Sequence, residues 1–341
     1  MKRTTDALLP LFLLAAPVMA EPLAIAVPAT AETEGTRGDA DDPAIWVDPG
    51  DPADSLILGT DKTAGLYVYG LDGAVRDFLP GGHLNNVDVR PFRIGDREVG
   101  LAGATRRDDD TLVFYVIDEG GVRPATPWQH AAIPPGIGAD DIYGFAMGQD
   151  SGGTYAIVNF KSGHVVQWRI HESQGTLRLE PARTLRVGSQ PEGMVVDDRA
   201  GHLYVGEEDK GIWRFPLSPA GGTDGTRIAA IPSDCLPRDD VEGLAILDGP
   251  VRYLVASAQG VHRAALFRLE GEAAPACEAM VEIAPGAVDG VTETDGLDVT
   301  AKPVGPDFPG GLLVMMDDQN AGFTTNFKLI AWDAILAQLP N

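Results

Sequence analysis

A pattern of about 50 residues recurs along the chain, and this repeat constrains the fold more than any other feature of the sequence. Six segments each begin with a polar or acidic residue that leads into an apolar run, and two further strand-like runs follow. Their starting residues are spaced 46, 55, 49, 50 and 53 positions apart and are Asp42, Asp88, Tyr143, Glu192, Glu242 and Asp295. With Gly and Pro in the connections, this period predicts an all-β chain folded as a six-bladed β-propeller.

Two other folds fit the sequence less well. A pair of β-sandwiches is the main alternative, but it does not explain six similar segment starts. A helical solenoid would need amphipathic helical periodicity, which we do not find in the chain.

The first residues have the pattern of an export signal. Lys2 and Arg3 precede an apolar run of 11 residues, Leu8 to Val18, which is too short to span a bilayer. Small residues before position 21 predict cleavage after Ala20. We therefore expect a signal peptide over residues 1–20 and a single propeller domain over residues 21–341, in a protein that is periplasmic or secreted. Export permits a disulfide between Cys235 and Cys277, with two free thiols as the alternative.

The chain is strongly acidic, with a formal net charge of −24. Loss of residues 1–20 removes two positive charges and one negative charge, which leaves −25. Such a surface repels nucleic acid and anionic lipid, so we expect neither nucleic acid nor a membrane as a partner. An anionic substrate would need cations between it and the protein.

Acidic residues recur at the segment starts. The innermost strand of each propeller blade lines the central channel, so these side chains should converge at one mouth. The acids expected there are Asp41, Asp42, Asp88, Glu192, Asp240, Glu242 and Asp295. Crowded carboxylates repel one another unless a cation lies between them, and oxygen ligands without His or Cys clusters favour Ca²⁺ or Mg²⁺. The alternative is that the acids are solvated or cap turns.

Basic residues occupy a second repeat position. Lys62, Arg107 and Lys161 each end the second strand of one of the first three segments, whereas acids dominate the last three. One side of the mouth would then be basic and the other would hold metal ions. That arrangement suits a phosphate ester.

Several motifs made of these residues resemble those of the β-propeller phytases. The resemblance covers about residues 31–335, and its motifs are Asp39–Trp46, Asn85–Arg90, Tyr143–Phe145, Glu192–Met194, Glu207–Asp209, Asp240–Leu244 and Thr294–Asp298. It implies a calcium-dependent 3-phytase that hydrolyses phytate, or its calcium complex, to lower inositol phosphates. It also implies several Ca²⁺ ions, some structural and some catalytic.

The resemblance further implies individual site residues. Those that match calcium-site positions are Glu32, Asp41, Asp42, the backbone of Val87, Tyr143, Glu192, Glu208, Asp240, Glu242, Gln259, Asp289, Asp295 and Asn320. Those that match phosphate-binding positions are Lys62, Arg107, Tyr143 and Lys161, and the implied catalytic set adds Glu192 and Glu208. The chain departs from the family pattern at Arg106, Ser162 and Gln319, where Asn, Glu and an acid are common.

We expect direct hydrolysis by metal-assisted water attack, with Glu192 or Glu208 orienting the water. No Arg-His-Gly-x-Arg run, His-Cys-x₅-Arg loop or Gly-x-Ser-x-Gly elbow is present to supply a covalent route. We also expect a monomer that acts on a small molecule. The alternatives are a lactonase-like calcium-dependent propeller hydrolase, which needs no basic side to its channel, and a non-catalytic propeller in which calcium is purely structural.

Overall fold

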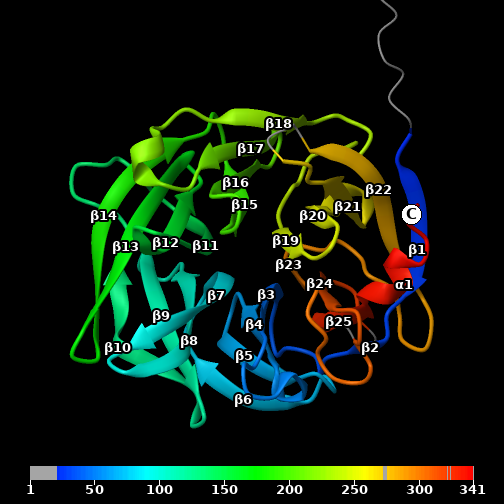
Figure 1. The fold of residues 1–341 in the computed structure, drawn as a ribbon, viewed down its shortest axis with the longest axis horizontal. Helices are drawn as coiled ribbons and strands as arrows, with labels where there is room; N and C mark the ends of the chain where they lie inside the picture. The colour runs from blue at the N-terminus through cyan, green and yellow to red at the C-terminus, as the bar shows by residue number, and fades with distance from the viewer. Residues whose placement is uncertain (1–20, 272–274, 321, 323, 341) are drawn as a thin grey trace, which may run out of the picture.

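Six β-sheets surround a central axis in the computed structural model, which describes residues 21–271, 275–320, 322 and 324–340 (Figure 1). Each sheet is one blade, and its first strand in chain order lies nearest the axis in the first four blades. The six-bladed β-propeller predicted from the repeat is thereby confirmed. The expected signal peptide, residues 1–20, lies outside the described residues.

The strands follow one another outwards within each blade. Blade one contains β3 (Ala40–Trp46), β4 (Leu56–Asp61), β5 (Gly65–Gly70) and β6 (Val75–Pro80), and blade two contains β7 (Leu84–Ile94), β8 (Arg97–Arg106), β9 (Thr111–Asp118) and β10 (Gly121–Ala131). Blade three contains β11 (Ile142–Asp150), β12 (Gly153–Phe160), β13 (His164–Ser173) and β14 (Thr176–Arg186), and blade four contains β15 (Pro191–Asp197), β16 (His202–Glu207), β17 (Gly211–Pro216) and β18 (Thr226–Ala230).

The last two blades combine strands from both ends of the chain. Blade five contains β19 (Leu244–Asp248), β20 (Arg252–Ala258), β21 (Arg263–Arg268), β22 (Ala276–Ala284) and β1 (Leu23–Pro28), and blade six contains β23 (Leu297–Thr300), β24 (Leu312–Asp317), β25 (Asn326–Ala331) and β2 (Ala31–Glu32). One short helix, α1 (Trp332–Leu336), follows β25.

The blades pack against one another face to face, which explains why their middle strands are apolar on both sides. Between blades three and four, Tyr155 and Ile157 of β12 share a buried cluster with Leu203 and Val205 of β16. A strand covered on both faces reads as a continuous apolar run rather than as an alternating one. The hydrophobic core is therefore a set of layers between blades.

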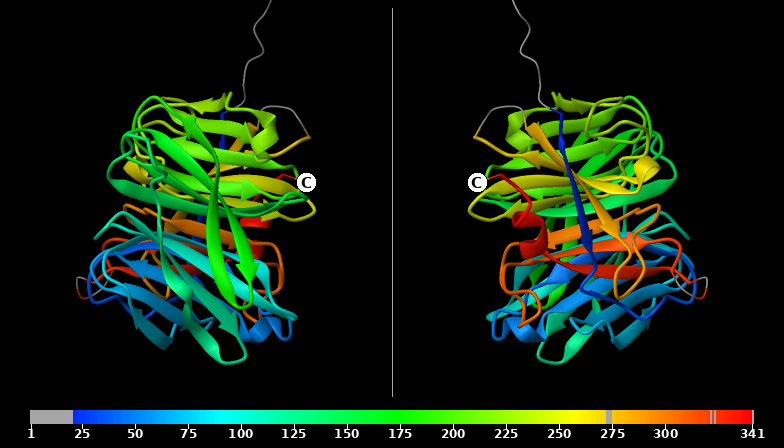
Figure 2. Two further views of the ribbon diagram at one scale, coloured as in Figure 1. Left: turned by 90° about the vertical axis from the view of Figure 1, so that its left-hand side faces the viewer. Right: turned by 90° about the vertical axis from the view of Figure 1, so that its right-hand side faces the viewer.

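The N-terminal strands close the ring. β2 pairs antiparallel with β25 and supplies the outer strand of blade six. β1 then pairs parallel with β22 as a fifth strand of blade five, with Ile25 and Val27 buried. Figure 2 shows β1 in blue beside β22 in orange and α1 in red. The sequence analysis did not assign these two strands.

A disulfide joins Cys235, in the loop before β19, to Cys277 in β22, with the two Cα atoms 5.9 Å apart. This decides between the two alternatives left open for the cysteines, since neither is a free thiol. Within the described part of the chain, every helix is too short or too polar to cross a lipid bilayer.

We predict that Ile25→Ala lowers the free energy of unfolding by about 2–5 kcal/mol, because it leaves a cavity at the β1–β22 seam. Leu23→Ala is the matched control on the same strand, since Leu23 is 40% exposed and its truncation should cost less than about 0.5 kcal/mol. Urea unfolding of both variants, in chelator, tests this. Equal losses in the two variants would contradict a stabilising role for the buried face of β1.

Candidate metal and phosphate site

A two-residue β-bulge interrupts the innermost strand of each of the first four blades at the same place. In β3, β7, β11 and β15, two residues lie opposite one residue of the second strand. The first bulge residue in chain order is Asp41, Asn85, Tyr143 and Glu192, and the equivalent positions before β19 and β23 are Glu242 and Asp295. Bulges re-aim side chains, and these six residues form what we call the bulge ring.

The bulge ring corrects two of the predicted segment starts. In blade one the ring residue is Asp41 rather than Asp42, and in blade two it is Asn85 rather than Asp88. The predicted spacing aligned Asp88 with the other segment starts, whereas the strand register aligns Asn85 with Tyr143 and the four acids of the ring.

Neighbouring bulges contact one another through their backbones. The residue after each ring position is glycine in blades three to six. A Cβ atom on Gly193 would lie 2.5 Å from the carbonyl oxygen of Glu242. One on Gly296 would lie 2.7 Å from that of Asp41, to which the Gly296 N–H donates at 3.0 Å. Only glycine permits this approach, which brings the ring side chains together.

Small polar residues on the second strand hold several bulges in place. Asn159 accepts from the N–H of Gly144 at 2.7 Å and donates to the carbonyl of Glu192 at 2.7 Å, so it links blades three and four. Thr105 donates to the carbonyl of Tyr143 at 2.5 Å. Sequence analysis missed these residues. The available signal was a small polar residue at the penultimate position of the second strand, which recurs as Thr60, Thr105, Asn159 and Ser257.

Two ring glutamates converge with Glu208, which follows β16, and we call these three residues the acid triad. One oxygen from each of Glu192, Glu208 and Glu242 lies within 4.8 Å of the others. Glu192 is 1% exposed, and its Oε2 has no hydrogen-bond partner among the described residues. Burial, then the charges of Asp41 and Asp295, raises the pKa of Glu192 well above its usual value. Burial also raises the pKa of Glu208 and of Glu242.

Lys62 lies between two ring carboxylates. Its Nζ is 3.0 Å from Asp41 Oδ1 and 2.5 Å from Asp295 Oδ2. Burial raises the pKa of Asp41 to about 6, although the charge of Lys62 opposes this rise. Asp41 Oδ2 is buried, and no described residue forms a hydrogen bond with it.

Tyr143 carries the other two predicted phosphate ligands on its ring. Lys161 Nζ lies 4.4 Å from the ring centroid and Arg107 Cζ lies 5.4 Å from it. Burial, followed by the charges of Glu192 and Glu242, raises the pKa of Tyr143, so its hydroxyl stays protonated at neutral pH. The cationic groups of blades two and three therefore lie next to the acid triad of blades four and five.

Two more predicted residues join the triad. Gln259 Nε2 donates to Glu242 Oε2 at 2.6 Å and also to Asp295 Oδ1. The backbone of Asp240 connects it to the residues around the triad. Its N–H donates to the carbonyl of Glu208 at 3.0 Å, and its carbonyl accepts from the N–H of Gln259.

Glu32, Asp289 and Asn320 form a separate cluster, which is centred on the fully buried ammonium of Lys328. Lys328 Nζ lies 2.5 Å from Glu32 Oε2 and 3.2 Å from Asn320 Oδ1, and it also contacts Asp289. It lies 3.3 Å from Asp317 Oδ2 as well. The chain itself thus supplies a cation to this cluster, and the sequence analysis did not foresee Lys328.

Asp42 and Val87 link blades one and two. Asp42 Oδ2 accepts from the Val87 N–H at 3.0 Å, and burial raises the pKa of Asp42 well above its usual value. Of the positions where the chain departs from the family pattern, Arg106 pairs with Asp109 and Ser162 Oγ lies 2.9 Å from His164 Nδ1.

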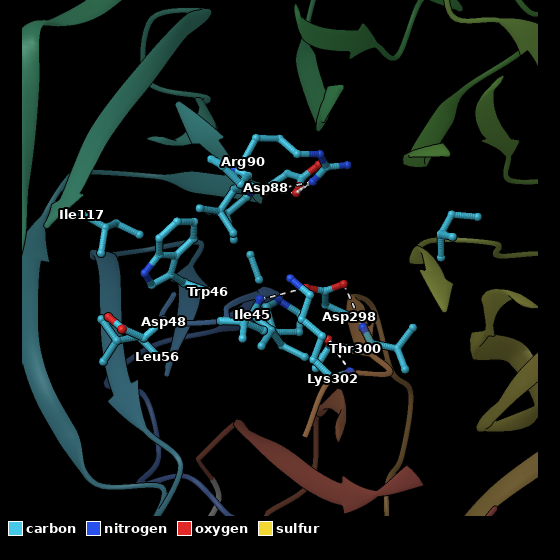
Figure 3. A pocket seen from close by; sticks show the side chains of 18 of the residues that line it. Ile45, Trp46, Asp48, Leu56, Asp88, Arg90, Ile117, Asp298, Thr300 and Lys302 are labelled. Carbon is cyan, nitrogen blue, oxygen red and sulfur yellow. Dashed lines mark hydrogen bonds and ion pairs between the residues drawn. The ribbon is translucent and has the colours of Figure 1, made fainter. Parts of the chain in front are cut away.

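Asp88 does not join the ring, so that expectation is wrong. It lines a cavity of about 1210 Å³ that extends along the inner strands away from the ring, and Figure 3 shows it there with Arg90 and Asp298. Asp88 accepts from the N–H of Met147 at 2.8 Å, and Asp298 accepts from that of Ile45 at 2.8 Å. Both carboxylates make the same contact to the next blade and tie neighbouring blades together.

The donor set at the ring fits a hard divalent cation. Asp41 and Glu192 have buried oxygens without hydrogen-bond partners in the described part of the chain, and three carboxylates converge within 4.8 Å. Unpaired buried carboxylates are costly unless a cation compensates them. The ligands are oxygen atoms in irregular positions, which suits Ca²⁺ better than Zn²⁺.

Comparison with known proteins identifies relatives of the whole chain. A family model described as Phytase matches residues 9–341. The 3-phytase of Bacillus subtilis (strain 168) is 36% identical over 315 residues, which cover 88% of this chain and 81% of that protein. Among solved structures, the β-propeller domain of Cps50 (Swd1) from Myceliophteria thermophila matches with a TM-score of 0.51 at 10% identity, over 88% of this chain and 85% of that one. The last likeness concerns the fold alone.

We predict that Gly193→Ala destabilises the protein by about 1–3 kcal/mol, because the added methyl group meets the carbonyl of Glu242. Gly138→Ala is the control, since a Cβ there has no atom within 4 Å among the described residues. Urea unfolding measures both. A Gly193→Ala variant as stable as Gly138→Ala would show that the ring does not depend on the backbone contact.

Proposed function

Because this chain belongs to the phytase family, we propose that it is a phosphatase that releases phosphate from phytate, myo-inositol hexakisphosphate, in a Ca²⁺-dependent reaction. One observation supports this more than any other. The acid triad Glu192, Glu208 and Glu242 lies beside Tyr143, whose ring carries Lys161 and Arg107. Cations stabilise the negative charge of a phosphate ester, and this site offers metal ligands on one side and cationic side chains on the other.

The proposed Ca²⁺ ligands at the mouth are the acids of the ring and triad. A bound Ca²⁺ supplies positive charge to phosphate oxygens and makes an attacking water more acidic. The acidic chain, with its formal net charge of −24, would otherwise repel a polyanion. The substrate we propose is therefore phytate or its calcium complex.

Each side chain at the mouth has a separate role in the proposed reaction. Lys161 and Arg107 bind oxygens of the phosphoryl group and stabilise the charge that develops on them. Tyr143 keeps both cations in place through their contacts with its ring. Lys62 bridges Asp41 and Asp295 and offsets the repulsion between these two carboxylates. In this proposal Glu208, half-buried directly after β16, orients the attacking water, and no phosphoenzyme is required.

The two rival functions lack this support. A lactonase-like hydrolase would have no use for Lys161 and Arg107 beside the acids. A non-catalytic propeller with purely structural calcium would likewise have no use for these two cationic side chains beside its metal ligands. We further propose that the protein is an exported monomer, periplasmic or secreted, and the disulfide between Cys235 and Cys277 is consistent with an oxidising compartment.

We predict that Lys161→Met lowers kcat/KM for phytate by about 100- to 1000-fold, as expected when one donor to a developing oxyanion is lost. Lys302→Met, which changes a lysine at the opposite cavity, should leave activity unchanged. The assay is phosphate release from phytate with added Ca²⁺ and after chelation. Activity that survives chelation, or full activity in Lys161→Met, would refute the mechanism.

Chelation should also destabilise the folded protein, because it leaves buried carboxylates uncompensated. At a hundredfold excess of Ca²⁺ over its dissociation constant, one bound ion adds about 2.7 kcal/mol to the free energy of unfolding. Denaturant unfolding in Ca²⁺ and in chelator, at matched ionic strength, measures the difference. Identical curves would show that Ca²⁺ does not bind the native state.

A further inference from the structure

A side-chain amide contacts each member of the acid triad. Asn85 Nδ2 donates to Glu192 Oε1 at 3.0 Å, and Gln190 Nε2 donates to Glu208 Oε1 at 2.7 Å. Gln259 makes the corresponding contact with Glu242. The three amides come from blade two, from the residue before blade four and from blade five, so three separate parts of the chain supply the same interaction.

Each amide donates to one carboxylate oxygen of its glutamate. In Glu192 the second oxygen, Oε2, is buried and has no hydrogen-bond partner in the described part of the structure. A carboxylate fixed at one oxygen keeps a single orientation, and the free oxygen then points to a constant position. The acid triad is thus arranged before any ion binds.

The chemical type of these donors matters. A neutral amide orients a carboxylate without cancelling its charge, whereas an ammonium group would neutralise it and compete with an ion. The cluster around Lys328 shows the second case in the same molecule, because there a buried lysine satisfies Glu32 and Asp289. At the acid triad neutral amides take the place of that lysine, so no ammonium group competes with an ion for these carboxylates.

Asn85 is the clearest example. It occupies the ring position that is acidic in four other blades and Tyr143 in blade three, and it is fully buried. Its Nδ2 also donates to Asn86 Oδ1 at 2.9 Å. Two acceptors therefore lie next to Nδ2. Because an acceptor needs an N–H donor, these contacts fix which end of the Asn85 amide faces Glu192.

We propose that Asn85 and Gln190 are positioning residues that hold Glu192 and Glu208 in the orientation for binding Ca²⁺. This inference rests on the proposed function, since it concerns the same site. Both residues act through a carboxylate, so they should affect the calcium requirement of the enzyme more than its turnover when calcium saturates.

The test compares Asn85→Leu and Gln190→Met with the wild-type protein. Both variants remove an amide donor at nearly constant volume. Titration calorimetry with Ca²⁺ should show an affinity weaker by about 10-fold or more for each variant. This is the usual effect of losing a residue that hydrogen-bonds to a metal ligand. Because several Ca²⁺ ions can bind, the one held by the acid triad is identified as the binding step that is lost in Glu208→Gln. In the phytate assay, kcat should return to the wild-type value at saturating Ca²⁺.

Gln129→Met is the matched control. Gln129 Nε2 donates to Asp109 Oδ2 at 2.6 Å, so it has the same amide–carboxylate contact on an exposed part of blade two. Its calcium affinity should equal that of the wild type. Unfolding in chelator shows whether each variant is folded, and Gln190, which lies in a half-buried loop, provides the test if Asn85→Leu does not fold.

The outcomes separate the two proposals. If the wild type hydrolyses phytate with Ca²⁺ but the folded variants bind Ca²⁺ with unchanged affinity, the positioning role is overturned and the proposed function stands. The same holds if extra Ca²⁺ fails to restore kcat. If the wild type neither binds Ca²⁺ nor needs it, the proposed function fails and this inference fails with it.

Discussion

The backbone contact between neighbouring bulges is the constraint on which the rest of this structure depends. At Gly193 and Gly296 the chain lies so close to the next blade that a side chain has no room. The contact holds the inner strands close together at one mouth of the channel. The side chains of the bulge ring therefore lie near one another. Carboxylates that would repel each other and move apart in an unfolded chain are thereby held at short distances. The burial of apolar surface between blades supplies the free energy that offsets this repulsion.

The protein compensates these acids in more than one way. Lys62 supplies an internal cation to Asp41 and Asp295, and Lys328 does the same for Glu32 and Asp289. At the acid triad the partners are neutral amides, which donate to one oxygen of each carboxyl group and bring no positive charge of their own. The carboxylates beside Lys62 and Lys328 are thus compensated by the chain itself. The acid triad is not, so it can take up an external cation, and it lies next to Lys161 and Arg107.

The closure of the ring explains how such a site can be rigid. β2 completes blade six and β1 adds to blade five, so the blades on either side of the seam are held by strands from opposite ends of the chain. Asn159 ties blade three to blade four, while Asp88 and Asp298 repeat one contact between other blades. A carboxylate that must keep a metal-binding position benefits from a frame in which each blade is fixed by its neighbours.

Much of the fold and part of the site could be predicted from the sequence. The apolar runs at a period of about 50 residues were enough to indicate six blades, because each blade needs the same strands to bury the same faces. The residues directly after the second strands, such as Lys161 and Glu208, were also assigned to the mouth, since a repeat places equivalent residues at equivalent heights. The assignment of Asp88 failed because the bulge in β7 places Asn85 at the ring, three positions before Asp88, and side-chain type alone does not reveal where a bulge lies.

The sequence by itself determined the blade architecture, the acidic character of the mouth and the presence of a few basic residues beside it, because these follow from local periodicity and composition. Only the tertiary structure decided which acids meet, which are paired with Lys62 or Lys328 and which are held by amides such as Asn85. Those contacts join residues from different blades, and Glu32 and Lys328 are separated by 296 positions. Their distances depend on how the closed ring brings the blades together, which no local pattern of residues encodes.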